Sequence, residues 1–182
     1  MTTFEYVSVL LAIVISLALA HMLTGLAQVI RARKVRFSLV HTGYVGLILF
    51  CCVDYWFSMW QQRGLESWAL WYVGLLLLTA AILYVAAWLI VPEVETGGTV
   101  DLVAFDEANR RKYIAALFIY IAVAVVVNLS IATLQWAVLI NVGTLLTLGA
   151  AWLWQDKRVQ WVCLAVIYAL WVYYALNFIP AL

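Results

Sequence analysis

Six long apolar runs, separated by short polar breaks, fill almost all of this 182-residue chain. They cover residues 5–31, 37–62, 67–91, 109–134, 136–155 and 159–179. A helix needs about 20 mostly apolar residues to cross the ~30 Å hydrocarbon layer of a bilayer, and each run reaches that length. In lipid, the backbone polar groups must be satisfied within the protein. We therefore expect an all-α fold, a single domain over residues 1–182 with six transmembrane helices packed as a bundle.

The scarcity of charge supports this class and excludes others. Charged residues make up 10 % of the chain and hydrophobic residues 68 %, whereas a soluble domain carries about 25 % charged residues. The chain has no basic stripe for nucleic acid and no phosphate-loop, dinucleotide or zinc-protease motif. We expect the lipid bilayer as a partner, no nucleic acid, no metal and no catalytic residues. No cofactor is predicted, with haem and pigment left as open alternatives, and non-enzymatic roles are favoured.

The basic residues are distributed very unevenly between the breaks. Nine of the ten Lys and Arg residues lie in or beside the first, third and fifth breaks, and only Arg63 lies in the second. Because positively charged loops stay in the cytoplasm, both termini are predicted to lie on the non-cytoplasmic side. The first run carries Glu5 and follows no basic residue, unlike a signal peptide, so we expect a retained helix. We place the chain in the inner (plasma) membrane of a bacterium.

The third break, residues 92–112, is long enough to hold structure of its own. We predict a cytoplasmic loop with a short helical extension of the fourth run, N-capped by Asp101. Two pairs there have the i,i+4 spacing of ion pairs on a solvated helical turn: Asp106 with Arg110, and Glu107 with Arg111.

The first run contains small residues at every fourth position, ending in a polar one. The series is Ser8, Ala12, Ser16, Ala20, Thr24 and Gln28. Small side chains at this spacing let two helix backbones approach closely in lipid. We predict that Ser8, Ala12, Ser16, Ala20 and Thr24 form a helix-packing face. Its partner is another helix of this chain or a second copy, so a homo-oligomer or a larger membrane assembly is expected.

His21 lies in the middle of the first run, on the same polar edge as Gln28. An imidazole in lipid needs partners for both its N–H and its lone pair. One interpretation is a histidine satisfied by a neighbouring helix, and the other is a proton relay or ligand-binding group. His41, the second histidine, lies at a different predicted depth, which is unfavourable for a shared haem.

Asp54 is the one acid well inside a predicted span, and an acid there is costly unless it faces protein or water. Ser58 lies four residues further along the same helix face. Asn128 and Asn141 fall at a similar predicted depth in the fourth and fifth runs. We expect a polar pocket that opens outward, with Asp54 as its charge. The alternatives are independent hydrogen bonds between helices, or asparagines that cap shorter helices at the boundary between the fourth and fifth runs.

Two functions from different classes follow from these residues. The first is a small channel or transporter for a proton, an ion or a small solute. The residues predicted along its path are Asp54, His21, Asn128, Asn141, Ser58 and Gln28. The second is a structural or accessory subunit of a larger membrane complex, or a protein that binds lipid, quinone or pigment. A membrane enzyme acting on a lipid is the least favoured interpretation, because no paired catalytic motif is present.

Overall fold

The computed structural model describes residues 3–65, 67–94, 98–130 and 135–178. These ranges are almost entirely helical, as predicted. The helices are α1 (Thr3–Arg31), α2 (Leu39–Gln61), α3 (Leu70–Ile90), α4 (Leu102–Ser130), α5 (Gln135–Leu153) and α6 (Lys157–Phe178). Three short elements lie between them: β1 (Lys34–Arg36), the 3-10 turn η1 (Gln62–Gly64) and β2 (Thr99–Asp101). The boundary between α4 and α5 falls at residues 131–134, outside the described ranges.

Five of the described helical segments are long and apolar enough to cross a membrane. They are Thr3–Arg31, Leu39–Gly64, Leu70–Ile90, Leu102–Ser130 and Lys157–Asn177. The apolar helical segment of α5, Val138–Leu153, is shorter. The chain therefore has the helical, apolar character of an integral membrane protein.

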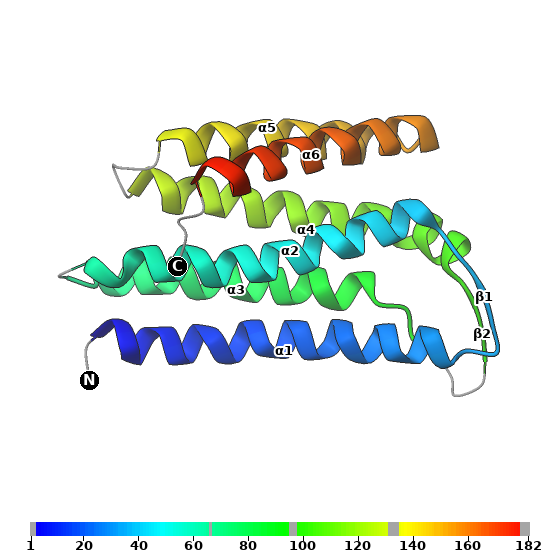
Figure 1. The fold of residues 1–182 in the computed structure, drawn as a ribbon, viewed down its shortest axis with the longest axis horizontal. Coiled ribbons are helices and arrows are strands. Elements are labelled where there is room, and N and C mark those ends of the chain that lie inside the picture. The colour runs from blue at the N-terminus through cyan, green and yellow to red at the C-terminus, as the bar shows by residue number, and fades with distance from the viewer. Residues whose placement is uncertain (1–2, 66, 95–97, 131–134, 179–182) are drawn as a thin grey trace.

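The helices lie side by side along the long axis of the molecule (Figure 1). The first helix, α1, forms one edge and packs mainly on α3. The middle of the bundle is made by α2, α3 and α4, and α5 and α6 pack together at the other edge. This order places the carboxyl-terminal ends of α2, α4 and α6 and the amino-terminal ends of α3 and α5 at one end of the bundle.

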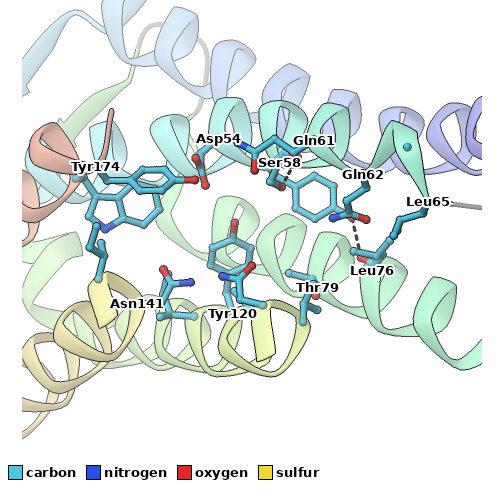
Figure 2. Close-up of a pocket in the computed structure, with 18 residues that line it drawn as sticks. Asp54, Ser58, Gln61, Gln62, Leu65, Leu76, Thr79, Tyr120, Asn141 and Tyr174 are labelled. Atoms are coloured by element: carbon cyan, nitrogen blue, oxygen red, sulfur yellow. Dashed lines mark hydrogen bonds between the residues drawn. The ribbon is translucent and has the colours of Figure 1, made fainter. Parts of the chain in front are cut away.

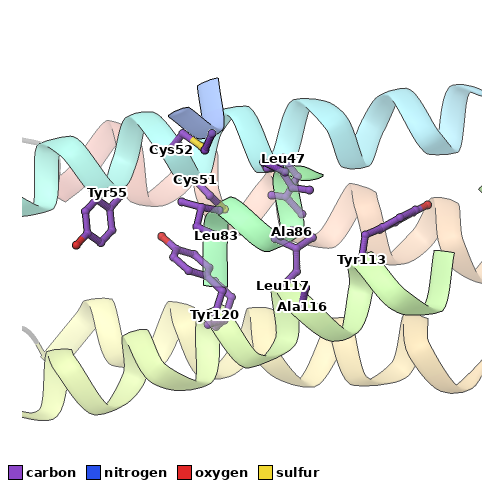
Figure 3. Packing of buried hydrophobic residues seen from close by; sticks show 14 of the residues in the cluster. Leu47, Cys51, Cys52, Tyr55, Leu83, Ala86, Tyr113, Ala116, Leu117 and Tyr120 are labelled. Atoms are coloured by element: carbon purple, nitrogen blue, oxygen red, sulfur yellow. The ribbon is translucent and has the colours of Figure 1, made fainter. Parts of the chain in front are cut away.

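The core runs between α2, α3 and α4. Figure 3 shows Leu47, Leu83 and Leu117 from these three helices gathered there, and each is no more than 2 % exposed. Cys51 and Cys52 belong to the same core. These two cysteines and Cys163 are buried free thiols.

The face through which α1 packs inside this chain differs from the predicted stripe. The buried residues are Val7, Leu11, Ile15, Ala18, Met22, Gly25 and Val29. Of the small-residue stripe, Ser8 and Ala12 are half-buried, while Ser16, Ala20 and Thr24 are exposed. A strict four-residue series rotates by about 40° per step around a helix of 3.6 residues per turn, so it leaves the contact line. The mixed spacing of three and four residues keeps to that line.

The predicted helical extension within 92–112 begins at Leu102, directly after its predicted N-cap Asp101. The preceding residues Thr99–Asp101 form β2, which pairs in parallel with β1. The β-branched pair Thr99 and Val100 suits this extended segment. Asp101 Oδ1 accepts hydrogen bonds from the amides of Val103 and Ala104, each at 3.0 Å, which confirms the predicted N-cap.

The prediction that Asp106 and Arg110 lie on a solvent-exposed helical turn is wrong. Asp106 and Arg110 are only 1 % and 3 % exposed. The carboxylate of Asp106 accepts hydrogen bonds from Arg110, Tyr113 and Ser38. Because α2 begins at Leu39 and its N-cap Ser38 lies directly against α4, the first turn of α4 is covered by protein.

The predicted ion pair between Asp106 and Arg110 is present, whereas the second predicted pair, Glu107 with Arg111, does not form among the described residues. Glu107 pairs with Lys157 of α6 at 3.3 Å. The guanidinium of Arg111 instead lies over the ring of Trp152, 5.8 Å from its centroid. Both contacts join α4 to the α5–α6 region, and a pattern of charges along one helix does not reveal such neighbours.

Candidate functional site

A cavity of about 270 Å³ lies between α2, α3, α4, α5 and α6. It reaches the end of the bundle at Gly64 and Leu65, beside Arg63, which belongs to the break predicted to be non-cytoplasmic. Its polar lining includes Asp54, Ser58, Gln61, Tyr120, Asn128 and Asn141. The structure therefore brings together four of the predicted site residues: Asp54, Ser58, Asn128 and Asn141.

Asp54 is the acidic side chain among the described residues that line this cavity. The spacing of Cys51, Asp54, Ser58 and Gln61 places them on one face of α2, and Figure 2 shows the last three along the cavity. The Asp54 atom Oδ1 is buried and has no hydrogen-bond partner in the described ranges. Tyr174 of α6 extends toward Asp54 from the side in the same view.

Several other polar side chains in the cavity also lack protein partners. Within the described residues, the side chains of Gln61, Tyr120, Asn128 and Asn141 make no hydrogen bond, although all four line the cavity. The hydroxyl of Tyr120 is directed across the cavity toward α2 (Figure 2). Amide and phenol groups in lipid need partners, so the free hydrogen-bonding capacity here is available to an occupant.

Several hydroxyl groups in and around the cavity are satisfied by the protein itself. Thr79, Thr144 and Thr147 each donate to the carbonyl four residues earlier, at 2.7–2.9 Å. Tyr44 donates to Gln160 Oε1 at 2.7 Å. Among the described residues, the buried side-chain atoms without a partner are Asp54 Oδ1 in this cavity and His21 Nε2 and Trp68 Nε1 outside it.

Two of the aromatic rings that line the cavity are held by hydrogen bonds. The hydroxyl of Tyr55 donates to the carbonyl of Leu76 at 2.8 Å. Trp171 donates from Nε1 to Thr144 Oγ1 at 3.1 Å and packs edge-on against Phe50, with ring centroids 4.9 Å apart. These rings are therefore fixed parts of the wall.

The cavity is closed toward the middle of the bundle. Below Asp54, the core residues Leu47, Ile48, Cys51 and Leu83 are each no more than 2 % exposed. Among the described residues, no Lys or Arg lines the cavity. Arg63 lies nearby, but its guanidinium is over the Trp60 ring, 4.8 Å from the centroid. The arrangement is a one-ended polar cavity with a carboxyl group and no balancing cation.

His21 and Gln28 lie elsewhere. They line a separate recess of about 590 Å³ near the other end of the bundle, with Trp88, Phe105 and Lys112. The His21 ring is near-parallel to that of Trp88, with centroids 6.5 Å apart, and its Nε2 is buried without a partner among the described residues. The hypothesis that His21 and Asp54 line one path is not supported, because they belong to two different cavities.

Sequence reasoning missed the aromatic wall of the cavity. Tyr120 precedes Asn128 on α4 with Ala124 between them, and all three line the cavity. This four-residue spacing is the signal that would have placed Tyr120 beside a predicted site residue. The contributions of Trp171 and Tyr174 depend on the packing of α6 against α2 and α5, which no local pattern shows.

The chain matches no protein-family model, no curated protein and no solved structure. What the fold and the cavity define is a class: a helical, membrane-type bundle with a carboxyl-bearing polar cavity at one end.

Proposed function

We propose that this protein is a small membrane transporter or channel that takes a proton, an ion or a small solute into the Asp54 cavity. One observation supports this most strongly. The Asp54 carboxyl has a buried oxygen without a partner among the described residues, in a cavity where Gln61, Tyr120, Asn128 and Asn141 also make no hydrogen bond within those residues. A carboxyl group in a membrane interior costs about 2.5–3.5 kcal/mol even on lenient scales. An occupant that balances it offsets part of this cost.

The one-sided shape favours a carrier over a permanently open pore. The core between Asp54 and the opposite end is packed around Leu47, Leu83 and Leu117. A solute held in the cavity crosses only if this packing rearranges, as it does in carriers that alternate between two states.

The proposal includes six spans, with α5 as the sixth. The described part of α5, Gln135–Leu153, packs along α4 and α6 for its whole length in Figure 1. With the nine basic residues in the cytoplasm, both termini and the mouth of the cavity face the other side of a bacterial inner membrane.

The test is flux through purified protein in liposomes. Asp54→Asn keeps the size of the side chain and removes its charge, so we expect solute-coupled or proton flux to fall at least tenfold. Asp101→Asn, which changes an exposed acid far from the cavity, is the matched control and should keep full flux. Unchanged flux in a folded Asp54→Asn protein would remove the proposal.

A second candidate function is favoured by the recess around His21. This site combines the rings of Trp88 and Phe105 with the unpartnered Nε2 of His21, which suits a lipid, quinone or pigment with a hydrogen-bonding head. Under this proposal the protein is a binding or accessory subunit. Mass spectrometry of an organic extract of the purified protein, compared with His21→Phe, tests it, and an extract without a retained molecule argues against it.

The small-residue face of α1 is proposed as a contact with a second copy. Ser16, Ala20 and Thr24 are exposed in the single chain and lie away from the α3 contact. Cross-linking through Ala20→Cys in native membranes should give a dimer, whereas Leu146→Cys on the exposed face of α5 should not.

A further inference from the structure

We infer that the occupant of the Asp54 cavity is a small organic ammonium ion. This inference rests on the proposed function and names its substrate class. The first argument is charge. Asp54 is an acid in a cavity lined by no Lys or Arg among the described residues. A bound anion or a free carboxylate group would face Asp54 without any balancing cation, whereas an ammonium group supplies the opposite charge.

The second argument is size. The cavity volume of about 270 Å³ is many times the ~10–15 Å³ that one water molecule needs. A bare metal cation instead needs several oxygen ligands close around it, at about 2.3–2.6 Å for calcium. The described residues contain no group of three or more His, Cys, Asp or Glu side chains placed to hold a metal ion. The space therefore suits a polyatomic cation better than a bare metal ion.

The third argument is the aromatic wall. Tyr55, Tyr120, Trp171 and Tyr174 come from α2, α4 and α6 and line the same cavity as Asp54. Aromatic faces attract cations through their quadrupole, and tryptophan does so best. Quaternary and alkylated ammonium groups, which carry their charge on an apolar surface, benefit most from such walls. Inorganic ions of the same charge lose their water shell on entry and gain less.

The fourth argument is the free hydrogen-bonding capacity. The amide oxygens of Asn128 and Asn141 and the hydroxyl of Tyr120 accept hydrogen bonds, and none makes one within the described part of the chain. An ammonium group with N–H donors, or an attached hydroxyl group, is matched to this set. The carboxyl, the rings and the amides together describe a site for an amine of modest size.

The experiment measures binding to the purified protein in lipid nanodiscs. The probes are tetramethylammonium and methylammonium, with potassium and acetate for comparison. We expect saturable binding of both ammonium ions by calorimetry, with no competition from acetate and at least tenfold weaker competition from potassium. Asp54→Asn should weaken ammonium binding at least tenfold.

The aromatic wall is tested with matched variants. Trp171→Phe keeps an aromatic ring and should weaken tetramethylammonium binding several-fold, and Tyr174→Leu should weaken it further. Trp154→Leu, which removes an exposed tryptophan far from the cavity, should bind as the unchanged protein does. Thermal unfolding of each variant separates loss of the site from loss of the fold. If Trp171→Phe and Tyr174→Leu fold and bind tetramethylammonium as well as the unchanged protein does, the aromatic rings do not contribute to cation binding.

The outcomes separate this inference from the proposed function. Asp54-dependent proton or potassium flux without ammonium binding removes the inference and leaves transport standing. Ammonium binding that depends on Asp54, without flux of any probe, supports the inference and removes transport. If neither binding nor flux depends on Asp54, both fail.

Discussion

Two acids in this bundle, Asp54 and Asp106, have opposite surroundings. Asp106 accepts hydrogen bonds from Ser38, Arg110 and Tyr113 and is almost fully buried. Asp54 has a buried oxygen with no partner in the described ranges and lies at the wall of a cavity. A satisfied buried acid holds the structure together, whereas an unsatisfied acid beside open space is available to bind. The hydrogen bonds of each residue thus distinguish Asp106, a structural acid, from Asp54, a candidate functional one.

Arg110→Met is the substitution that tests the structural assignment. It removes the cation that balances Asp106 and leaves a buried carboxylate with only neutral donors. Breaking such a pair costs about 3–5 kcal/mol, so we expect a large fall in the thermal unfolding midpoint in detergent. Adding Asp106→Leu to Arg110→Met should recover part of the loss, because no charge is then buried alone. A single variant as stable as the unchanged protein would contradict the assignment.

The sequence predicted Asp54 correctly as a pocket residue but misjudged Asp106. Asp54 stands out because it interrupts an apolar run and shares a helix face with Ser58. Asp106 and Arg110 have the same i,i+4 spacing in solvent and in a buried network, so the pattern cannot distinguish the two. The difference comes from Ser38, which is 68 positions away in the chain.

At the scale of the elements, the contact between α1 and α3 depends on Gly25. A Cβ atom built on Gly25 would lie 2.2 Å from Cγ1 and 3.3 Å from Cβ of Val91, the residue directly after α3, so this β-branched side chain would have to shift. The close approach therefore depends on the absence of a side chain at this position.

Gly25→Ala should consequently destabilise the bundle. Overpacking a well-filled contact costs about 1–3 kcal/mol. Gly74→Ala is the control, because nothing lies within 4 Å of a Cβ atom there. In a helix interior, replacing Gly by Ala gains roughly 0.5–1 kcal/mol, so this variant should unfold at the same or a higher temperature. Equal unfolding temperatures for the two variants would show that the α1–α3 contact has room for a methyl group at residue 25.

The pairing of β1 with β2 is connected to the N-cap of α4 through Asp101. The amide of Ala104 lowers the pKa of Asp101 most, and Arg36, at 3.1 Å, adds to the same effect. Since the folded pKa is depressed below the usual value of about 3.9, the cap is complete above that pH and is lost as the pH falls through the folded pKa.

Hydrogen exchange tests this pH dependence. The amides of Val103 and Ala104 should be protected at pH 5 and lose protection, relative to their intrinsic rates, below about pH 4. Asp101→Asn retains an acceptor for the cap but has no charge to lose, so its protection should not change over this range. Protection of both amides in the unchanged protein that is independent of pH would argue against the cap.

At the scale of the whole molecule, hydropathy predicts where the helices lie in the sequence. It does not predict which helices pack against one another. The predicted runs match α2 and α3 to within a few residues, because length and apolar content decide where a helix can form in lipid. Which faces meet is decided by side-chain shape. The sequence predicts the small-residue stripe as the packing face of α1. In the structure, Val7, Leu11 and Ile15 are buried against the rest of the chain instead.

The same reasoning explains the candidate site. The sequence predicts Asp54, Asn128 and Asn141 at a similar depth in the membrane. In the structure all three line one cavity. His21 was predicted on the same path as a polar group in a span, but α1 lies at the edge of the bundle and His21 lines a separate recess. How the six helices are arranged around one another in the bundle cannot be deduced from a single sequence.

The most direct test of the account is the chemical accessibility of Ser58→Cys, in a protein whose three native cysteines are replaced by alanine. A cationic ethylammonium thiosulfonate should modify this cysteine from the non-cytoplasmic side, on the order of tenfold faster than the anionic sulfonate reagent. Adding Asp54→Asn should remove that preference, and Leu146→Cys should stay unmodified in the lipid. Modification from the cytoplasmic side only, or equal rates for both reagents with Asp54 intact, would contradict an outward cavity controlled by its carboxyl group.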